Sequence, residues 1–377
     1  MYSKEERQRR LDAAAALMER ENLNAILLLG NGTVGTNAFS NYRYFTDNRS
    51  STNIDVALIT KDAKLWAVVT SVMDKHHMMK NTFIDNPVIF TDRLGWNINY
   101  LKEHGLDKGR LGTLLEVMPS SWYLRIQKEL PDIELVDVSA ALFEIRTHKS
   151  LEEAEVHRQC AKIADAGYEA FIKAAVPGAY EHEVVAQAVG AMQKLGADDF
   201  FMLTASGKFS ATESNMTTLH NTAGIDRKLE NGDSISMEIT PYFNGCWTQL
   251  VRTLCVGEYN ADVDEFRRVT VKAIDAAVEL IKPGIPISNL VTAMRNVIED
   301  EGYRLAMPCG HICGADLNEE RLGEDNTRLL LPGMCVIIHP TVLNDTLKSG
   351  IYWGETYLVT ETGVEPLMTA SKELPGK

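Results

Sequence analysis

The chain has 377 residues, of which 45% are hydrophobic and 24% are charged, and its formal net charge is −14 at pH 7. This composition is that of a globular protein with a large core, and the length favours two or three domains. Because the chain is acidic and has no run rich in Lys and Arg, nucleic acid and anionic membranes are poor partners. The longest apolar run, over residues 25–29, is far shorter than the roughly 20 residues of a membrane span.

The N-terminus, Met-Tyr-Ser-Lys-Glu-Glu, lacks the apolar segment of a signal peptide, so we expect a cytoplasmic protein. The six cysteines are too sparse to staple a chain of this length. In a protein without an export signal, we expect them to be reduced thiols.

The N-terminal third mixes helical and strand patterns. Apolar residues at helical spacing predict a helix over residues 4–21. The other elements predicted here are strands over 25–29, 56–59, 63–69, 88–90 and 134–136, and helices over 71–80 and 120–130. Together they predict an α/β domain over residues 1–147.

The second predicted domain, residues 148–377, begins at a capping box formed by Ser150 and Glu153. It contains an internal repeat, in which a long helix ends at Pro-Gly, a second amphipathic helix follows, and a strand led by glycine comes next. In the first half, the first predicted helix ends near residue 175 and the second covers residues 180–195. In the second half, the two predicted helices cover residues 263–281 and 288–301.

The repeat predicts two halves related by a pseudo-two-fold axis. Glu238 follows Gly232 by six residues, and His339 follows Gly333 by six residues. The two side chains would then occupy equivalent strand positions and converge on one central site. The alternative is that the Pro-Gly pairs simply end helices.

A β-hairpin is predicted around Asn244-Gly245, because both residues tolerate the positive φ of a tight turn. The two-residue loop places Glu238 opposite Val251. Glu238 and Gln249 then share one face of the hairpin, within roughly 8 Å of each other, and Arg252 falls on the other face. The alternative for Glu238 is a solvated strand residue.

Several spaced motifs carry a resemblance to a known family. They are Arg146, Lys149-Ser150, Ser206-Gly207, His220-Asn221, Gly232-Asp233, Arg252-Thr253, Gly310-His311, Pro332-Gly333-Met334 and Val359-Thr360. Taken together, they resemble the superfamily of creatinase, aminopeptidase P, prolidase and methionine aminopeptidase, which has the pita-bread fold. The resemblance implies an α/β (α+β) protein with a creatinase-type N-terminal domain, a duplicated pita-bread catalytic domain, and a homodimer.

The metallopeptidases of this superfamily hold two metal ions with two Asp, one His and two Glu. The positions that match these ligands are Glu238, Gln249, His311, His339 and Gly354. A neutral amide, a neutral imidazole and a glycine cannot offset the charge of two divalent ions. We therefore expect no metal cofactor, as in the creatinase branch.

A single-metal alternative remains open at this stage. Glu238, His311 and His339 would form a facial set for one transition ion. A shift of one residue would add Glu355 to them.

The resemblance implies that His220 transfers protons, which an imidazole can do in both directions near neutral pH. Without the resemblance, His220 would be interpreted as a hydrogen-bonded loop histidine. The carboxylates with which creatinase binds a guanidinium group are absent here, because their positions hold Val251 and His339. The predicted substrate is therefore a small polar compound with a C–N bond, such as an amide, an amidine or a cyclic amide.

The prediction is thus a metal-independent, creatinase-like hydrolase with a histidine acid–base mechanism. The candidate catalytic residues are His220, Glu238, His311 and His339, and the candidate substrate-binding residues are Gln249, Arg49 and Glu355. Arg49 is included because, in creatinase-like dimers, an arginine of an N-terminal loop reaches the neighbouring subunit's site. The alternatives are a metal-dependent Xaa-Pro dipeptidase or aminopeptidase, a lyase on the same scaffold, and a binding protein without catalysis.

Overall fold

The computed structural model describes residues 2–31, 40–49, 54–84, 87–210, 217–218 and 227–375. The chain divides into two compact units, Met1–His148 and Lys149–Lys377, one residue after the predicted boundary. Across the described ranges, no helix is both long enough and apolar enough to span a membrane.

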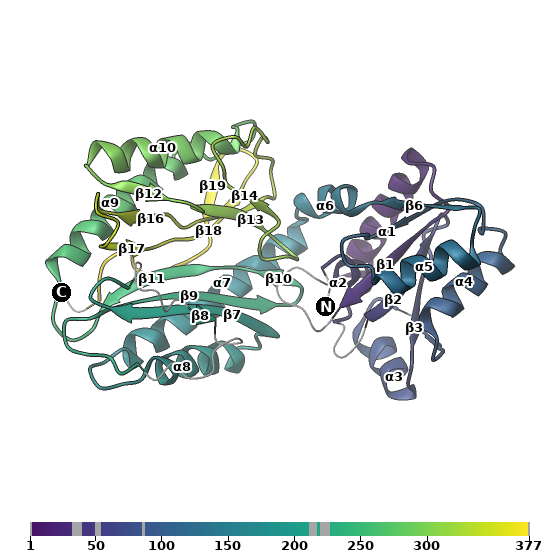
Figure 1. Ribbon diagram of the computed structural model, residues 1–377, viewed down its shortest axis with the longest axis horizontal. Helices are drawn as coiled ribbons and strands as arrows, with labels where there is room; N and C mark the ends of the chain where they lie inside the picture. Colours follow the sequence, from purple (N-terminus) through teal and green to yellow (C-terminus); the bar gives the residue numbers. More distant parts are fainter. Residues whose placement is uncertain are drawn as a thin grey trace. The chain divides into compact units, whose positions relative to one another are not determined.

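The first unit is a sheet with helices on both sides (Figure 1). Its described strands are ordered β4-β3-β2-β1-β5-β6. They are β1 (Ala25–Asn31), β2 (Ile54–Thr60), β3 (Leu65–Val69), β4 (Val88–Ile89), β5 (Gly109–Thr113) and β6 (Ile133–Asp137). The helices are α1 (Lys4–Arg20), α2 (Ser40–Thr46), α3 (Val72–Asn81), α4 (Arg93–Glu103), α5 (Ser120–Glu129) and α6 (Ser139–Thr147).

The central strand β1 explains why this sheet is covered on both sides. Ile26 and Leu28 belong to one buried apolar cluster, whereas Leu27 and Leu29 belong to another. Since successive side chains of a strand point to opposite faces, each face of the sheet has its own core.

Four elements of this unit, α2, α4, α6 and β5, were not predicted from the sequence. Strand β5 has two glycines among its five residues and therefore a weak β pattern. It nevertheless lies between β1 and β6 in the sheet, where pairing on both sides decides its conformation.

The second unit begins with the predicted capping box. The hydroxyl of Ser150 accepts the backbone N–H of Glu153 at 3.2 Å, and the Glu153 carboxylate accepts the N–H of Ser150 at 2.9 Å. The helices are α7 (Leu151–Ala174), α8 (Glu181–Lys194), α9 (Ala261–Val278) and α10 (Ile287–Asp300). In Figure 1, α7 and α8 line one side of the strands, and α9 and α10 line the other.

The strands between these helix pairs belong to two halves. The first half has β7 (Asp199–Gly207), β8 (Thr217–Thr218), β9 (Ser234–Phe243), β10 (Cys246–Trp247) and β11 (Leu250–Cys255). The second half has β12 (Arg304–Ala306), β13 (Gly310–Cys313), β14 (Glu320–Arg321), β15 (Cys335–Ile338), β16 (Thr341–Leu343), β17 (Gly350–Tyr352), β18 (Glu355–Val359) and β19 (Val364–Pro366). Strand β9 pairs with β7 and β11, and β15 pairs with β13 and β18 in the same way.

The backbone repeats the same hydrogen bonds in both halves, which confirms the predicted duplication. After the first helix of each pair, Gly178 and Gly284 have φ values of 90° and 86°. Gly178 donates to the carbonyl of Leu229 at 2.8 Å, and Gly284 donates to the carbonyl of Leu330 at 2.9 Å. The Pro-Gly pairs therefore do more than end helices, because each begins a matching bridge within its own half.

The two halves meet at Val251 and Gly354, which pair with each other. The N–H of Val251 donates to the carbonyl of Gly354 at 2.8 Å, and the reverse bond is 3.0 Å. The pseudo-two-fold axis passes through this pair, because Val251 and Gly354 follow their equivalent glycines, Gly232 and Gly333, by similar spacings.

Side chains on both sides of this pair repeat the symmetry. Thr356 Oγ1 accepts the N–H of Gln249 and donates to its carbonyl, both at 2.9 Å. Thr253 Oγ1 does the same for Tyr352, at 3.4 and 2.7 Å. Gln249 and Tyr352 are therefore equivalent positions of the two halves.

Candidate active site

Glu238 lies in the middle of β9, opposite Val251 on one side as predicted and opposite Leu203 on the other. The hairpin turn has the positive φ values expected at Asn244 and Gly245, 47° and 90°. Only 5% of Glu238 is exposed, and burial raises the pKa of its carboxyl to about 7. A carboxyl with this pKa can gain or lose a proton near neutral pH.

Tyr352 joins Glu238 to His339. Its hydroxyl donates to Oε1 of Glu238 and lies 3.0 Å from Nδ1 of His339. Sequence reasoning missed Tyr352, whose partner Glu238 lies 114 residues earlier in the chain.

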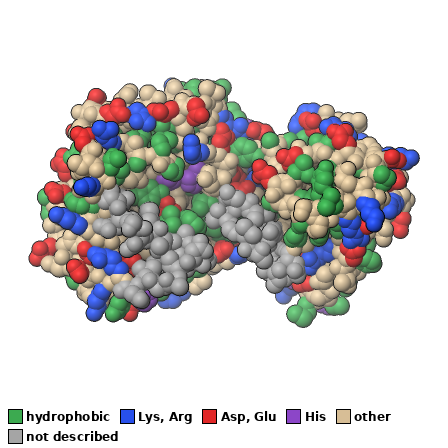
Figure 2. Space-filling view, in the orientation of Figure 1, with side chains coloured by type: hydrophobic (Ala, Val, Ile, Leu, Met, Phe, Trp, Pro, Cys, Tyr) green, Lys and Arg blue, Asp and Glu red, His purple; other side chains and the backbone are tan. Residues whose placement is uncertain are grey.

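The two candidate histidines, His311 and His339, lie side by side. The rings of His311 and His339 meet edge to face, with their centroids 5.1 Å apart. Burial lowers the pKa of His311 to about 4 and that of His339 to about 3, so both rings are neutral at pH 7. Figure 2 shows histidine surface in the middle of the visible face of this unit.

Two polar atoms near this cluster lack a partner within the described part of the chain. They are Oε1 of Gln249 and Nδ1 of His311, and both are buried. Gln249 shares its hairpin face with Glu238, since residues two apart in a strand point the same way. A buried amide oxygen without a donor costs free energy, so a ligand N–H would bind there favourably.

Glu355 lies outside this cluster. Its carboxylate accepts Nη2 of Arg252 at 2.6 Å and the hydroxyl of Tyr357 at 2.8 Å. Glu355 pairs with Ile338 in the sheet, so its side chain is on the face opposite that of His339. Gly354, and not Glu355, therefore stands beside His339, and we remove Glu355 from the candidate site.

The remaining candidates have no tested position in the site. His220 lies outside the described residues. Arg49 is partly buried in the first unit, just after α2. Its contact with a neighbouring subunit and the proton transfer by His220 stay predictions.

The donor set does not fit a two-metal centre. Within the described ranges, no group of three or more His, Cys, Asp and Glu side chains is arranged to hold a metal ion. The hydroxyl of Tyr352 donates a hydrogen bond to Oε1 of Glu238 and lies 3.0 Å from Nδ1 of His339, so both atoms already have a partner. The other ligand positions hold a neutral amide at Gln249 and no side chain at Gly354.

Gly354 also leaves no room for the missing carboxylate. A Cβ at this position would lie 2.5 Å from Cα of His339 and would clash with the carbonyl oxygen of Ile338. The strands have approached so closely that any larger residue must push them apart.

We expect Gly354→Ala to lower the free energy of unfolding by about 1–3 kcal/mol, the usual cost of overpacking. Urea unfolding monitored by circular dichroism measures this change. Gly363→Ala is the matched control, because a Cβ there meets no atom within 4 Å. Equal stability of the two variants would contradict the close approach of these strands.

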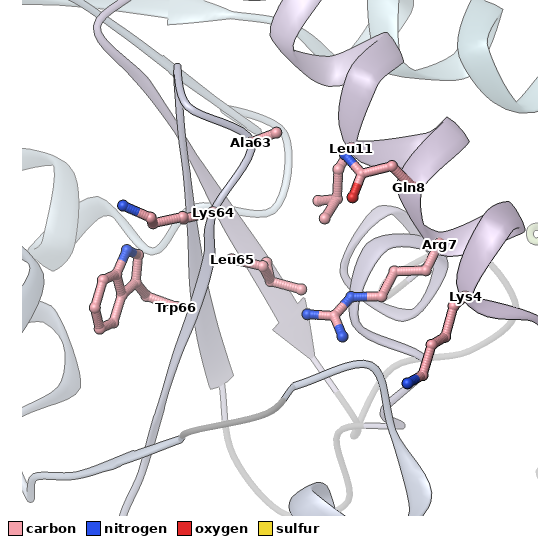
Figure 3. A pocket seen from close by; sticks show the side chains of 8 residues that line it. All are labelled: Lys4, Arg7, Gln8, Leu11, Ala63, Lys64, Leu65 and Trp66. Atoms are coloured by element: carbon pink, nitrogen blue, oxygen red, sulfur yellow. The ribbon is translucent and has the colours of Figure 1, made fainter.

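A pocket of about 450 Å³ lies elsewhere, in the first unit (Figure 3). It is lined by Lys4, Arg7, Gln8, Leu11, Ala63, Lys64, Leu65 and Trp66. None of the candidate site residues that the structure describes lines it.

Comparisons with known proteins agree with this architecture. A creatinase of Bacillus sp. is 27% identical over 97% of this chain and 90% of its own length. An Xaa-Pro dipeptidase of Pyrococcus furiosus is 28% identical over 64% of this chain and 68% of its own length. The crystal structure of a prolidase from Pyrococcus horikoshii OT3 superposes with a TM-score of 0.82 and 22% identity, over 97% of this chain and 99% of that one.

Two family descriptions divide the chain between them. Residues 10–148 match the creatinase/prolidase N-terminal domain, and residues 155–361 match metallopeptidase family M24. Since the second match covers more than half of the chain, the protein belongs to metallopeptidase family M24 and is a hydrolase of that family.

Proposed function

We propose that this protein is a metal-independent hydrolase that cleaves a C–N bond in a small polar metabolite, an amide, an amidine or a cyclic amide. The observation that carries the proposal is the linked cluster of Glu238, Tyr352 and His339 at the junction of the two halves. In the metallopeptidases that this sequence resembles, the equivalent junction holds the metal-binding carboxylates. Here it offers one carboxyl, a phenol and neutral imidazoles.

In the proposed reaction, His220 takes a proton from water, which adds to the carbon of the C–N bond. The protonated imidazole then returns the proton to the leaving nitrogen, so that one group serves both steps. His311 is neutral and can donate one N–H to the negative charge that develops on the substrate.

Glu238 and Gln249 would orient the substrate. The unpartnered Oε1 of Gln249 accepts hydrogen bonds but cannot be ionised. The carboxyl of Glu238 has its second oxygen free of hydrogen bonds from the described residues. Two acceptors on one hairpin face favour a substrate with N–H groups on a planar carbon, as in an amidine or an amide.

The second candidate is a metal-dependent Xaa-Pro dipeptidase. It is supported by the match to metallopeptidase family M24 and by the relatives that are Xaa-Pro dipeptidases. The two candidates differ in metal requirement and in substrate, so one pair of measurements separates them.

The test is elemental analysis of the purified protein before and after dialysis against chelator, followed by assays on two substrate panels. We expect less than about a tenth of an equivalent of any transition metal. Hydrolysis of a small amide, amidine or cyclic amide should survive the chelator. One tightly held equivalent, with Xaa-Pro cleavage that chelator abolishes and Mn²⁺ restores, would establish the dipeptidase instead.

A further inference from the structure

Tyr352 is held rigidly where the two halves meet. Its backbone carbonyl accepts the hydroxyl of Thr253 at 2.7 Å, and its N–H donates to the same hydroxyl at 3.4 Å. The side chain is 7% exposed, and its ring meets the ring of His339 edge to face at 5.2 Å. Because this hydroxyl is held in one position, it sets the direction of the hydrogen bonds to its neighbours as well as their length.

The number of hydrogens on this hydroxyl determines which ring nitrogen of His339 carries a hydrogen. A phenol has one hydrogen, and Tyr352 gives it to Oε1 of Glu238. At 3.0 Å from Nδ1 of His339, the phenol oxygen can then only accept. With the hydrogen bonds in this direction, the Nδ1 atom must carry a hydrogen.

We propose that Tyr352 is a positioning residue that holds His339 as the Nδ1–H tautomer and thereby presents its Nε2 lone pair to the substrate or to the attacking water. This proposal rests on the proposed function for its catalytic consequence. Within the described chain, Nε2 of His339 receives no hydrogen bond. It is therefore available to accept one.

The electrostatics of the cluster agree with this tautomer. Burial lowers the pKa of His339 to about 3, so the ring is neutral at pH 7 and has a single N–H. Burial and the neighbouring carboxyl of Glu238 raise the pKa of the Tyr352 phenol well above its usual range, so the phenol stays protonated.

The tautomer of His339 determines which role the ring can have. A hydrogen on Nε2 would let His339 donate to a negative charge that develops on the substrate. With its hydrogen on Nδ1, His339 has no N–H at Nε2 and accepts a hydrogen bond there. Stabilisation of negative charge then falls to His311, and His339 selects a substrate N–H or orients a water O–H.

The test measures the tautomer directly by NMR of protein labelled with ¹⁵N at histidine. The His339 ring signals are assigned by their loss in His339→Gln, and the hydrogen is located by its one-bond coupling to Nδ1 or Nε2. Above pH 7, where the carboxyl of Glu238 is ionised and can only accept, we expect the wild type to carry the hydrogen on Nδ1. In Tyr352→Phe, we expect the hydrogen to be shared between both nitrogens.

Tyr357→Phe is the matched control. It removes another buried phenol that donates to a carboxylate, at 2.8 Å from Glu355, without touching His339. It should leave the His339 signals as in the wild type. A wild-type hydrogen on Nε2 would overturn the proposal, even if Tyr352→Phe failed to fold. A folded Tyr352→Phe with wild-type ring signals would also overturn it.

Kinetics then test the catalytic consequence on the substrate found by screening. Tyr352→Phe should lower kcat by about 10- to 100-fold, the usual cost of removing a group that orients a functional histidine. KM should change much less, and Tyr357→Phe should keep the wild-type kcat. Because the NMR result needs no substrate, failure of the tautomer and failure of the hydrolase proposal are distinguishable.

Discussion

Glu238→Gln should slow turnover of the substrate by roughly 10²-fold, because it removes the carboxylate that orients the substrate, and, above neutral pH, it should make the protein more stable. Both effects have one cause. The carboxyl is buried at the junction of the two halves, and its hydrogen bond from Tyr352 compensates only part of the desolvation. A group needed by the reaction therefore costs the folded state free energy whenever it ionises.

The sign of the pH dependence follows from the pKa of Glu238. Burial raises it from 4.5 to about 7 in the native protein. Below pH 4.5 both states are protonated, and between pH 4.5 and 7 the native state holds a proton that the unfolded state releases. Stability therefore falls as pH rises through this window, by on the order of 3 kcal/mol in total. Glutamine cannot ionise and escapes this loss.

The buried histidines change the stability with pH in the opposite direction. They are present in both the wild type and Glu238→Gln. Burial lowers the pKa of His157, His311 and His339 below the usual 6.5. Their contribution to stability is lost as pH falls below 6.5, because the unfolded state takes up protons first. Subtracting the wild-type curve from that of Glu238→Gln removes this shared effect.

The measurement is urea unfolding of both proteins at several pH values between 4 and 8. We expect the stability difference to grow in favour of the variant as pH rises, most steeply between pH 4.5 and 7. Glu361→Gln, at an exposed turn, controls for the amide substitution. Parallel wild-type and Glu238→Gln curves would show that Glu238 ionises without cost and would contradict the raised pKa of its carboxyl.

The parts of this fold that the sequence predicted are those set by local chemistry. Asn244-Gly245 fixed the hairpin register, which placed Glu238 opposite Val251 and Arg252 on the other face. The Pro-Gly pairs and their spacing predicted the duplication, and the backbone bridges at Gly178 and Gly284 bear this out.

The parts that the sequence left open depend on contacts between distant segments. Whether Gly354 or Glu355 stands beside His339 is a matter of one residue of register, and a slip of one residue reverses every side chain of a strand. The pairing of Gly354 with Val251 settles it. Tyr352 was missed because its partner Glu238 lies 114 residues earlier, beyond the reach of any local pattern.

The second large effect is expected on stability, from Arg252 on the face of the hairpin opposite the candidate site. Arg252 is fully buried and forms an ion pair with Glu355 at 2.6 Å. It also donates to the carbonyls of Gly354 and Ser371, at 2.8 and 3.3 Å, and its guanidinium lies 4.7 Å from the ring of Trp353. One side chain thus ties the junction of the halves to the C-terminal segment.

Arg252→Met should lower the free energy of unfolding by about 3–5 kcal/mol, because the buried carboxylate of Glu355 loses its guanidinium partner and keeps, as a cation, Nζ of Lys372, 3.8 Å from its other oxygen. The double variant Arg252→Met/Glu355→Leu should recover part of this loss. Recovery should be incomplete, since the carbonyls of Gly354 and Ser371 still lose their donor. Urea unfolding of the two single variants and the double variant gives the coupling between the partners.

The matched control is the pair of Arg158 and Glu365, which has a similar distance of 2.7 Å but side chains 37% and 34% exposed. Arg158→Met should cost at most about 1 kcal/mol, because water screens this pair and solvates the carboxylate that remains. The two arginines therefore differ in burial, and the exposed one has the stronger pair geometry, because Arg158 binds both oxygens of Glu365, at 2.7 and 2.8 Å. Equal losses for Arg252→Met and Arg158→Met would contradict the assignment of Arg252 as the residue that locks the junction of the two halves.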